Sequence, residues 1–153
     1  MKTNQRLSSS VVSFGTDESG LKRLIIQVKD PVKHSLGILK FGVTDHVDSR
    51  MAKRAIKKEA VSIALLHGTQ FHKQGLVFHV MGDNNLPYNL HPQVEKLCRN
   101  LVVVTDENSG CIITSYRNSD PMRYVKKKAK RKEKDLLHFR ADHRNITAYL
   151  QNH

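Results

Sequence analysis

A histidine and two arginines recur at intervals of four residues in the middle of the chain. His46, Arg50 and Arg54 would share one face of a helix, because residues four apart lie one turn above each other. Cationic side chains on one face repel each other, so folding alone does not require this pattern. Imidazole can move a proton near neutral pH, and guanidinium groups neutralise phosphate charge. The spacing therefore predicts a site for phosphate.

A second set of polar side chains lies near the end of a predicted strand later in the chain. In residues 111–116, strand alternation places Ile112, Thr114 and Tyr116 on one side. Arg117 follows directly. If the histidine–arginine helix packs beside this end of the strand, the threonine and tyrosine could hold a phosphate or position a ribose hydroxyl. Arg117, and Lys53 on the helix, are then expected to contact neighbouring phosphates.

These groups together could cleave RNA without a metal. The 2′-hydroxyl would attack the adjacent phosphate, His46 would transfer a proton, and Arg50 and Arg54 would stabilise charge on the pentacoordinate phosphorus. We expect no cofactor and no metal site. The chain has no paired carboxylates at metal-binding spacing and neither of the motifs HExxH and GxxxxGK[ST].

Each of these side chains also has a structural explanation that the sequence leaves open. The histidine can cap its helix, and the arginines can be solvated or pair with Asp48 and Glu59. The threonine and tyrosine are good strand formers and can simply pack in a sheet. Both explanations are retained as hypotheses.

Two helices are expected to position the first group. Thr44 or Asp45 can cap a helix over residues 46–55, and a second, apolar helix over residues 58–67 ends near a glycine. Strand signals surround this pair, so a DNA-reading helix-turn-helix is a minor alternative. The residues of the first helix predicted to face the core are Val47, Met51 and Ala55.

Short apolar runs bounded by turn residues predict the strands. Residues 101–105 and 111–116 are the clearest pair, joined by Asp106-Glu107-Asn108-Ser109-Gly110, a composition typical of a hairpin turn. A polar gap precedes the strand at residues 75–81, and a loop and a helical turn follow it. Further strands are expected over residues 11–15 and 24–29, and residues 36–41 are either another short strand or the approach to the helix.

Positive charge is concentrated towards the C-terminus. The chain has a net charge of +12, and residues 123–134 hold eight of its 26 basic residues and one acidic residue. Like charges four residues apart destabilise the helix expected over residues 122–137, and phosphate binding would relieve the repulsion. Nucleic acid is the favoured partner, ahead of an acidic protein and a membrane surface. The basic residues assigned to nucleic acid here are Arg123, Lys126, Lys127, Lys128, Lys130, Arg131, Lys132 and Lys134.

Length and composition set the class of protein. A chain of 153 residues with 39% hydrophobic content is expected to form one globular domain. Its two cysteines form no CxxC pair, which favours a reducing compartment. No signal peptide or membrane span is evident. We therefore expect a cytoplasmic protein, or a secreted effector that acts in the cytoplasm of a target cell.

The stretch HVDSRMAKRAIKKEAVSIALLHG, then a polar gap, a strand, a loop and NLVVVTDENSGCIITSYR, resembles a small bacterial domain family. That family is grouped with the barnase/EndoU/colicin/RelE-like toxins, many of which cleave RNA without a metal. The resemblance covers about residues 41–117. It implies that five residues occupy characteristic positions of the family, and Ala55 replaces a glycine of its pattern. The five are His46, Arg50, Arg54, Thr114 and Tyr116.

The resemblance implies an α+β fold with N-terminal helices packed on a curved antiparallel sheet, as in RelE and colicin-type domains. We expect a mobile segment over residues 1–10, the toxin-like domain over 11–120, and a basic helical extension over 121–153. The expected function is a metal-independent endoribonuclease toxin acting on tRNA, rRNA or mRNA. The alternative is a non-catalytic RNA- or DNA-binding module. An acidic antitoxin or immunity protein is the expected protein partner.

Overall fold

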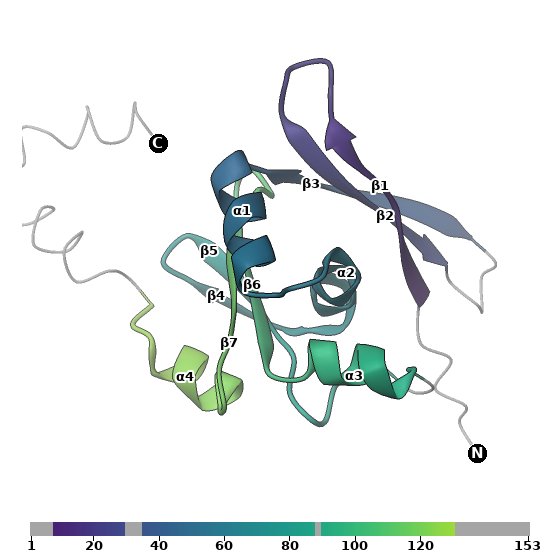
Figure 1. Ribbon diagram of the computed structural model, residues 1–153. Coiled ribbons are helices and arrows are strands. Elements are labelled where there is room, and N and C mark those ends of the chain that lie inside the picture. Colours follow the sequence, from purple (N-terminus) through teal and green to yellow (C-terminus); the bar gives the residue numbers. More distant parts are fainter. Residues whose placement is uncertain (1–7, 30–34, 88–89, 131–153) are drawn as a thin grey trace, which may run out of the picture.

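The structure is a computed structural model that describes residues 8–29, 35–87 and 90–130. These residues form an α+β fold with a seven-stranded sheet and four helices (Figure 1). The strands are β1 (Ser8–Thr16), β2 (Lys22–Lys29), β3 (Leu36–Val43), β4 (Thr69–Lys73), β5 (Leu76–Val80), β6 (Leu101–Asp106) and β7 (Ile112–Arg117). The helices are α1 (Asp45–Lys53), α2 (Lys58–His67), α3 (Pro92–Cys98) and α4 (Pro121–Lys127).

The sheet has the strand order β1-β2-β3-β7-β6-β5-β4 and consists of two antiparallel halves. The halves, β1–β3 and β4–β7, join at a single parallel pair, Val43 with Ile112. The sheet is therefore mixed, and the expectation of a purely antiparallel sheet was wrong. The difference arises because β3 leads into α1 and not into a hairpin, so its neighbour comes from the far end of the chain.

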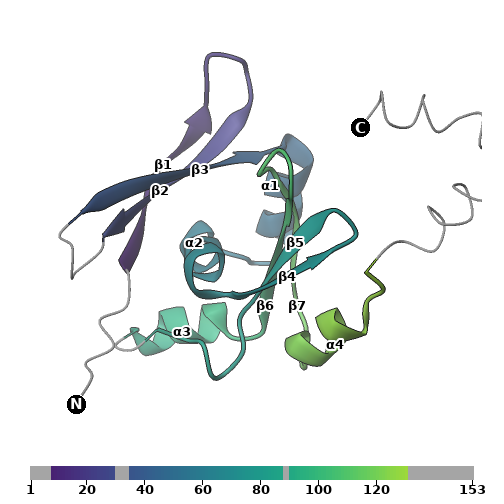
Figure 2. The ribbon, with the colours of Figure 1, turned by 180° about the vertical axis from the view of Figure 1, so that it is seen from behind.

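Helix α2 lies between the two halves of the sheet (Figures 1 and 2). Its buried side chains, including Val61 and Ala64, pack with Leu24 and Ile26 of β2 and with Leu101 of β6. A second core lies on the other face of the β4–β7 half, where α4 packs through Val125. Helices therefore cover both faces of this half, and β7 runs between α1 and α4.

The hairpin of β6 and β7 confirms the clearest strand prediction. A β-bulge interrupts it, since Val104 pairs with Thr114 whereas Thr105 pairs with Ile112, which leaves Ile113 as an extra residue. The bulge reverses the alternation, so Ile112 lies on the face opposite Thr114 and Tyr116. The prediction that all three share one face was wrong for Ile112.

Strand β4 was not predicted, because the sequence there looked like a polar gap. It is the last strand of the sheet, with only Phe71 and Lys73 half-buried, so it needs no apolar alternation. A two-residue turn joins it to β5, in which Gln74 has φ 60° and Gly75 has φ 70°. Both residues at positive φ are typical of the tight turn that suits the twist of a hairpin.

Helix α1 ends earlier than expected. Its last residue is Lys53, and Ala55 lies beyond it at φ 53°, in the left-handed region. Ala55 is therefore exposed, and the prediction that it faces the core was wrong; Ile56 takes that place with 5% exposure. A glycine would adopt this conformation with less strain, because it lacks a Cβ.

Helix α4 is also shorter than predicted. It ends at Lys127, and Lys128 is extended with ψ 137°, so the expected continuous helix to residue 137 was wrong. Residues 131–153, the rest of the expected basic extension, lie outside the described residues. At the other end of the chain, β1 begins at Ser8, so the domain boundary expected at residue 11 falls within a strand. No described helix has the length and apolar character needed to cross a membrane.

Candidate nucleic-acid interface

The N-terminus of α1 is fixed by a cap and by ion pairs. Thr44 caps it, accepting a hydrogen bond from the Val47 N–H at 3.2 Å through its hydroxyl. Lys22 of β2 lies 2.8 Å from Asp45 and 3.2 Å from Asp48, and these carboxylates raise the Lys22 pKa. Lys58 lies 3.7 Å from Asp48. The acidic residues of this helix therefore pair with lysines and not with the arginines, which the sequence had suggested as their partners.

The histidine–arginine face of α1 is exposed to solvent. His46 and Arg50 contact each other, with 3.5 Å between the imidazole Nε2 and the guanidinium Nη1. Lys53 is exposed on the last turn. Since the nearby carboxylates are paired with lysines, no acidic neighbour neutralises these groups within the contacts described for the helix. The face can therefore attract an anion.

Arg54 joins this face to the hairpin. Its guanidinium donates to the Ser115 carbonyl at 2.6 Å and to the Thr114 hydroxyl at 3.4 Å. Beyond the single pair with β3, this side of β7 is an edge of the sheet, and the arginine satisfies one of its backbone acceptors. The structure thus brings Arg54 and Thr114 together, as predicted, with a structural role for the arginine.

Tyr116 lies on the α4 side of the sheet. Its ring meets that of Tyr124 edge to face, with centroids 6.0 Å apart. Its hydroxyl is buried and has no hydrogen-bond partner among the described residues. Burial raises its pKa to about 12, and Tyr124 adds to the shift. The hydroxyl is therefore shielded from solvent, unlike the exposed His46 and Arg50, and the ring helps to dock α4 on the sheet.

Arg117 links the ends of two helices to β7. Its guanidinium donates to the backbone carbonyls of Arg54 and Leu97, both at 3.2 Å. These carbonyls lie at the C-terminal ends of α1 and α3, where backbone acceptors lack partners and a cation is favourable. Arg117 remains exposed, so it can hold the helices and still contribute positive charge.

Helix α4 begins at a cap and carries basic side chains outward. The carboxylate of Asp120 accepts from the Arg123 N–H at 3.4 Å, and Pro121 occupies the first turn. Arg123, Lys126 and Lys127 are exposed. Lys128 is half-buried, with its ammonium 4.6 Å from the Tyr124 ring centroid, and Lys130 is exposed. The predicted nucleic-acid-binding residues Arg131, Lys132 and Lys134 lie outside the described residues.

Lys73, which sequence analysis did not single out, holds the end of α4. Its ammonium donates to the carbonyls of Val125, Lys126 and Lys128, at 3.0, 2.7 and 2.9 Å. The neighbouring Gln74 donates to the carbonyls of Ala129 and Lys130. No sequence signal marks Lys73 except its place just before a turn, because its partners are main-chain atoms 52 to 55 residues away.

We name the exposed basic side chains of α1, the end of β7 and α4 together the cationic edge. These side chains can bind phosphates, and two of the elements that carry them, α1 and α4, lie beside the third, β7 (Figure 1). Among the described residues, no three His, Cys, Asp or Glu side chains gather as a metal site would require. The members of the cationic edge are Arg50, Lys53, Arg54, Arg117, Arg123, Lys126 and Lys127.

Comparisons with known proteins identify no relative of this chain: no protein-family model, no curated protein and no solved structure matches it.

Proposed function

We propose that the protein binds RNA along the cationic edge. The observation that supports this is the junction at Arg54, which joins α1 to β7 beside Thr114. From Thr114 the strand continues for three residues, roughly 10 Å, to Arg117 and the start of α4. Phosphates of one bound strand can therefore meet basic side chains from all three elements. RNA is favoured over DNA by the resemblance to ribonuclease toxins.

Binding should weaken steeply as salt rises, because each neutralised phosphate releases counterions. For a single strand, the logarithm of the association constant falls with slope of about −0.7 for every phosphate contacted. Replacing Arg50 and Lys53 by alanine, or Arg123 and Lys126, should each lower affinity about tenfold and reduce the slope by about 1.4. These four are chosen because Arg54 and Arg117 also hold the backbone. Fluorescence anisotropy with a labelled RNA of about 20 nucleotides, measured across a sodium chloride series, tests this expectation.

A matched control removes the same charge elsewhere. Lys29, at the end of β2, and Lys96, on α3, are exposed and lie outside the cationic edge. Their double alanine variant should keep the RNA affinity within about twofold, with an unchanged number of phosphate contacts. Equal losses in all three double variants would mean that net charge alone attracts RNA, and the proposal would be wrong.

Metal-independent RNA cleavage is a second candidate function, favoured by the exposed His46–Arg50 pair. The nucleophile belongs to the substrate, so the protein need only move protons and stabilise charge. His46 would take the proton of a 2′-hydroxyl as its oxygen attacks the adjacent phosphorus. The bond to the 5′-oxygen then breaks, and that oxygen takes up a proton. The products are a 2′,3′-cyclic phosphate and a 5′-hydroxyl end. Thr114, beside Arg54, would contact the phosphate.

Incubation of the protein with bulk tRNA and rRNA in EDTA tests the second candidate. His46→Ala should slow cleavage about 100-fold, since general acid–base catalysis contributes about 10²–10⁴, while RNA affinity stays within twofold. His72→Ala removes an exposed histidine of β4 and should change neither quantity. Tyr116→Phe should also leave cleavage intact, because this hydroxyl is buried. Intact RNA, or equal cleavage by the His46 variant, would leave a non-catalytic binding module.

The α+β class of the fold supports a RelE- or colicin-like domain, although three strands precede the first helix, where the resemblance implied N-terminal helices. Such a toxin would act in the cytoplasm of its own cell or of a target cell, and an acidic antitoxin or immunity protein would restrain it. Growth arrest on expression in a bacterial host, relieved by the His46→Ala variant, would favour the toxin over a binding module.

A further inference from the structure

One edge of β3 has no strand beside it over most of its length. The strand pairs with β2 throughout, from Val43 opposite Lys22 to Leu36 opposite Lys29. On its other side, only Val43 pairs with β7. Among the described strands, residues 36–42 therefore have no ladder partner on that side. Unpaired backbone N–H and C=O groups in a row form a template on which another extended chain can pair.

The same segment exposes apolar side chains. Leu36 is 64% and Ile38 is 63% exposed, although both belong to a regular strand. Alternation places them with Lys40 on the outer face, whereas Leu39 and Phe41 stand opposite Ile26 and Leu24 of the core side. Large apolar side chains beside an unpaired edge favour association with a partner, since an added strand would bury the side chains and complete the backbone ladder.

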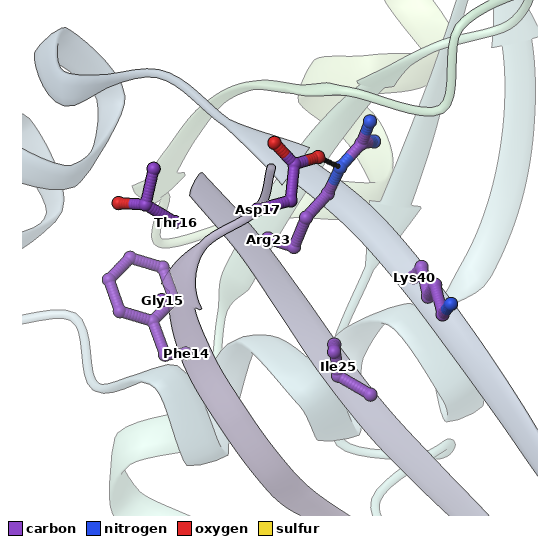
Figure 3. A pocket seen from close by; sticks show the side chains of 7 residues that line it. All are labelled: Phe14, Gly15, Thr16, Asp17, Arg23, Ile25 and Lys40. Atoms are coloured by element: carbon purple, nitrogen blue, oxygen red, sulfur yellow. Dashed lines mark hydrogen bonds and ion pairs between the residues drawn. The ribbon is translucent and has the colours of Figure 1, made fainter. Parts of the chain in front are cut away.

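A depression of about 480 Å³ adjoins this outer face, lined by residues of β1, β2 and β3 and by Asp17 in the turn after β1 (Figure 3). Ile25 provides an apolar wall, and Arg23 and Lys40 provide positive charge. Asp17 holds Arg23 at 2.9 Å, while Lys40 has no ion-pair partner among the described residues. The depression can therefore receive a side chain that carries a carboxylate.

Charge distinguishes among the chains that could occupy this edge. Residues 36–43 contain one charged residue, Lys40, and no acidic one, and Lys29 stands opposite Leu36. A second copy of this chain carries the same net charge of +12 and would be repelled. An acidic segment with alternating apolar residues would match the exposed side chains and the lysines together.

We propose that β3 is a docking strand for an extended, acidic segment of a partner protein. The segment adds a strand to the free edge of residues 36–42, places apolar side chains on Leu36 and Ile38, and directs a carboxylate to Lys40. This surface shares no residue with the cationic edge. The inference therefore stands or falls independently of RNA binding.

A labelled eight-residue peptide of alternating valine and glutamate is the probe, and the matching valine–lysine peptide is its control. The acidic peptide should bind saturably by anisotropy and slow amide exchange at residues 36–42 of the full chain. Ile38→Asp should weaken binding at least tenfold. Gln70→Asp makes a change of the same charge on the exposed edge strand β4 and should alter affinity less than twofold. Leu36→Asp repeats the test if the first variant unfolds.

Several results would overturn the proposal. Equal loss in the Ile38→Asp and Gln70→Asp variants would mean general charge attraction, and equal binding of the valine–lysine peptide would remove the preference for acidic partners. No saturable binding of the acidic peptide would also end it. Before peptide is added, the amides of residues 36–42 that bond to β2 should already be protected. Protection of the remaining amides, which point to the free edge, would identify another occupant: a second copy if protection rises with protein concentration, and this chain itself if it does not.

Discussion

Acidification from pH 6.5 to pH 4 is expected to lower the free energy of unfolding by about 3 kcal/mol through His79 alone. This side chain is 5% exposed and contacts the Thr105 hydroxyl at 3.2 Å. Burial, and secondarily the charge of His72, lowers the His79 pKa from 6.5 to about 4. Between these values the unfolded chain binds a proton that the folded chain excludes, so stability present above pH 6.5 is lost as pH falls. Below pH 4 this contribution is exhausted.

Urea unfolding at half-unit pH intervals measures the effect. His79→Gln keeps a hydrogen-bonding amide but cannot titrate, so its free energy of unfolding should vary about 3 kcal/mol less over the same range. His46→Gln removes an exposed histidine and should keep the dependence of the parent. The lowered pKa values of Asp17 and Asp106 act below their ordinary value of 3.8, outside this window. The same slope in His79→Gln and the parent would assign the pH dependence to other groups.

Replacing Lys73 by methionine is expected to detach the end of α4 and to cost about 2 kcal/mol of stability. An ammonium has three donors, and here all three meet carbonyls at the C-terminus of α4. Methionine fills similar space but leaves those carbonyls without the donor, at the end of a helix where a cation is favourable. Urea unfolding gives the loss of stability, and faster amide exchange of Tyr124 and Val125 locates it.

Controls on the same segments separate this contact from charge in general. Lys126→Met removes an exposed cation of α4 and should change stability by less than about 0.5 kcal/mol. Lys73→Arg should recover only part of the loss, because a planar guanidinium cannot direct three donors as an ammonium does. Unchanged exchange in α4 of Lys73→Met would show that apolar packing, through Val125 and the Tyr116–Tyr124 contact, positions the helix without the ammonium.

If α4 carries part of the RNA site, the substitution that loosens α4 should also lower RNA affinity. Lys73→Met leaves every residue of the cationic edge in the chain but loosens the helix that presents Arg123, Lys126 and Lys127. RNA affinity should therefore fall by a few-fold while the number of phosphates contacted at saturation changes little. The position of a basic residue would then matter as well as its charge.

The free edge of β3 and the cationic edge place different demands on partners. The first offers an unpaired backbone with apolar side chains, and the second offers exposed cations from three elements. An acidic protein with an extended segment could occupy the first and still extend towards the second, since β3 leads directly into α1. An inhibitor built in this way would need no contact with His46 to exclude RNA.

Local sequence patterns were enough to predict the elements with strong periodicity. The β6–β7 hairpin is made of two apolar runs around a turn of Asp, Asn, Ser and Gly, so neighbouring residues carry the whole signal. The apolar spacing of α2 and the capping Thr44 of α1 likewise act within a few residues. The exposed face of His46 and Arg50 also follows from helical spacing alone, because the buried face of α1 is defined by Val47 and Met51.

Tertiary structure decided how those elements meet. The bulge at Ile113 turned Thr114 and Tyr116 away from the face of Ile112, and the Tyr116 hydroxyl became buried beneath α4. Lys73 ends α4 through carbonyls more than 50 residues away, and the one-pair junction of β3 and β7 leaves the β3 edge free. The arginines at 54 and 117 bind main-chain atoms of other elements. Sequence spacing determines which side chains share a face, but contacts between distant backbone atoms carry no residue-type signal, and only the folded chain reveals them.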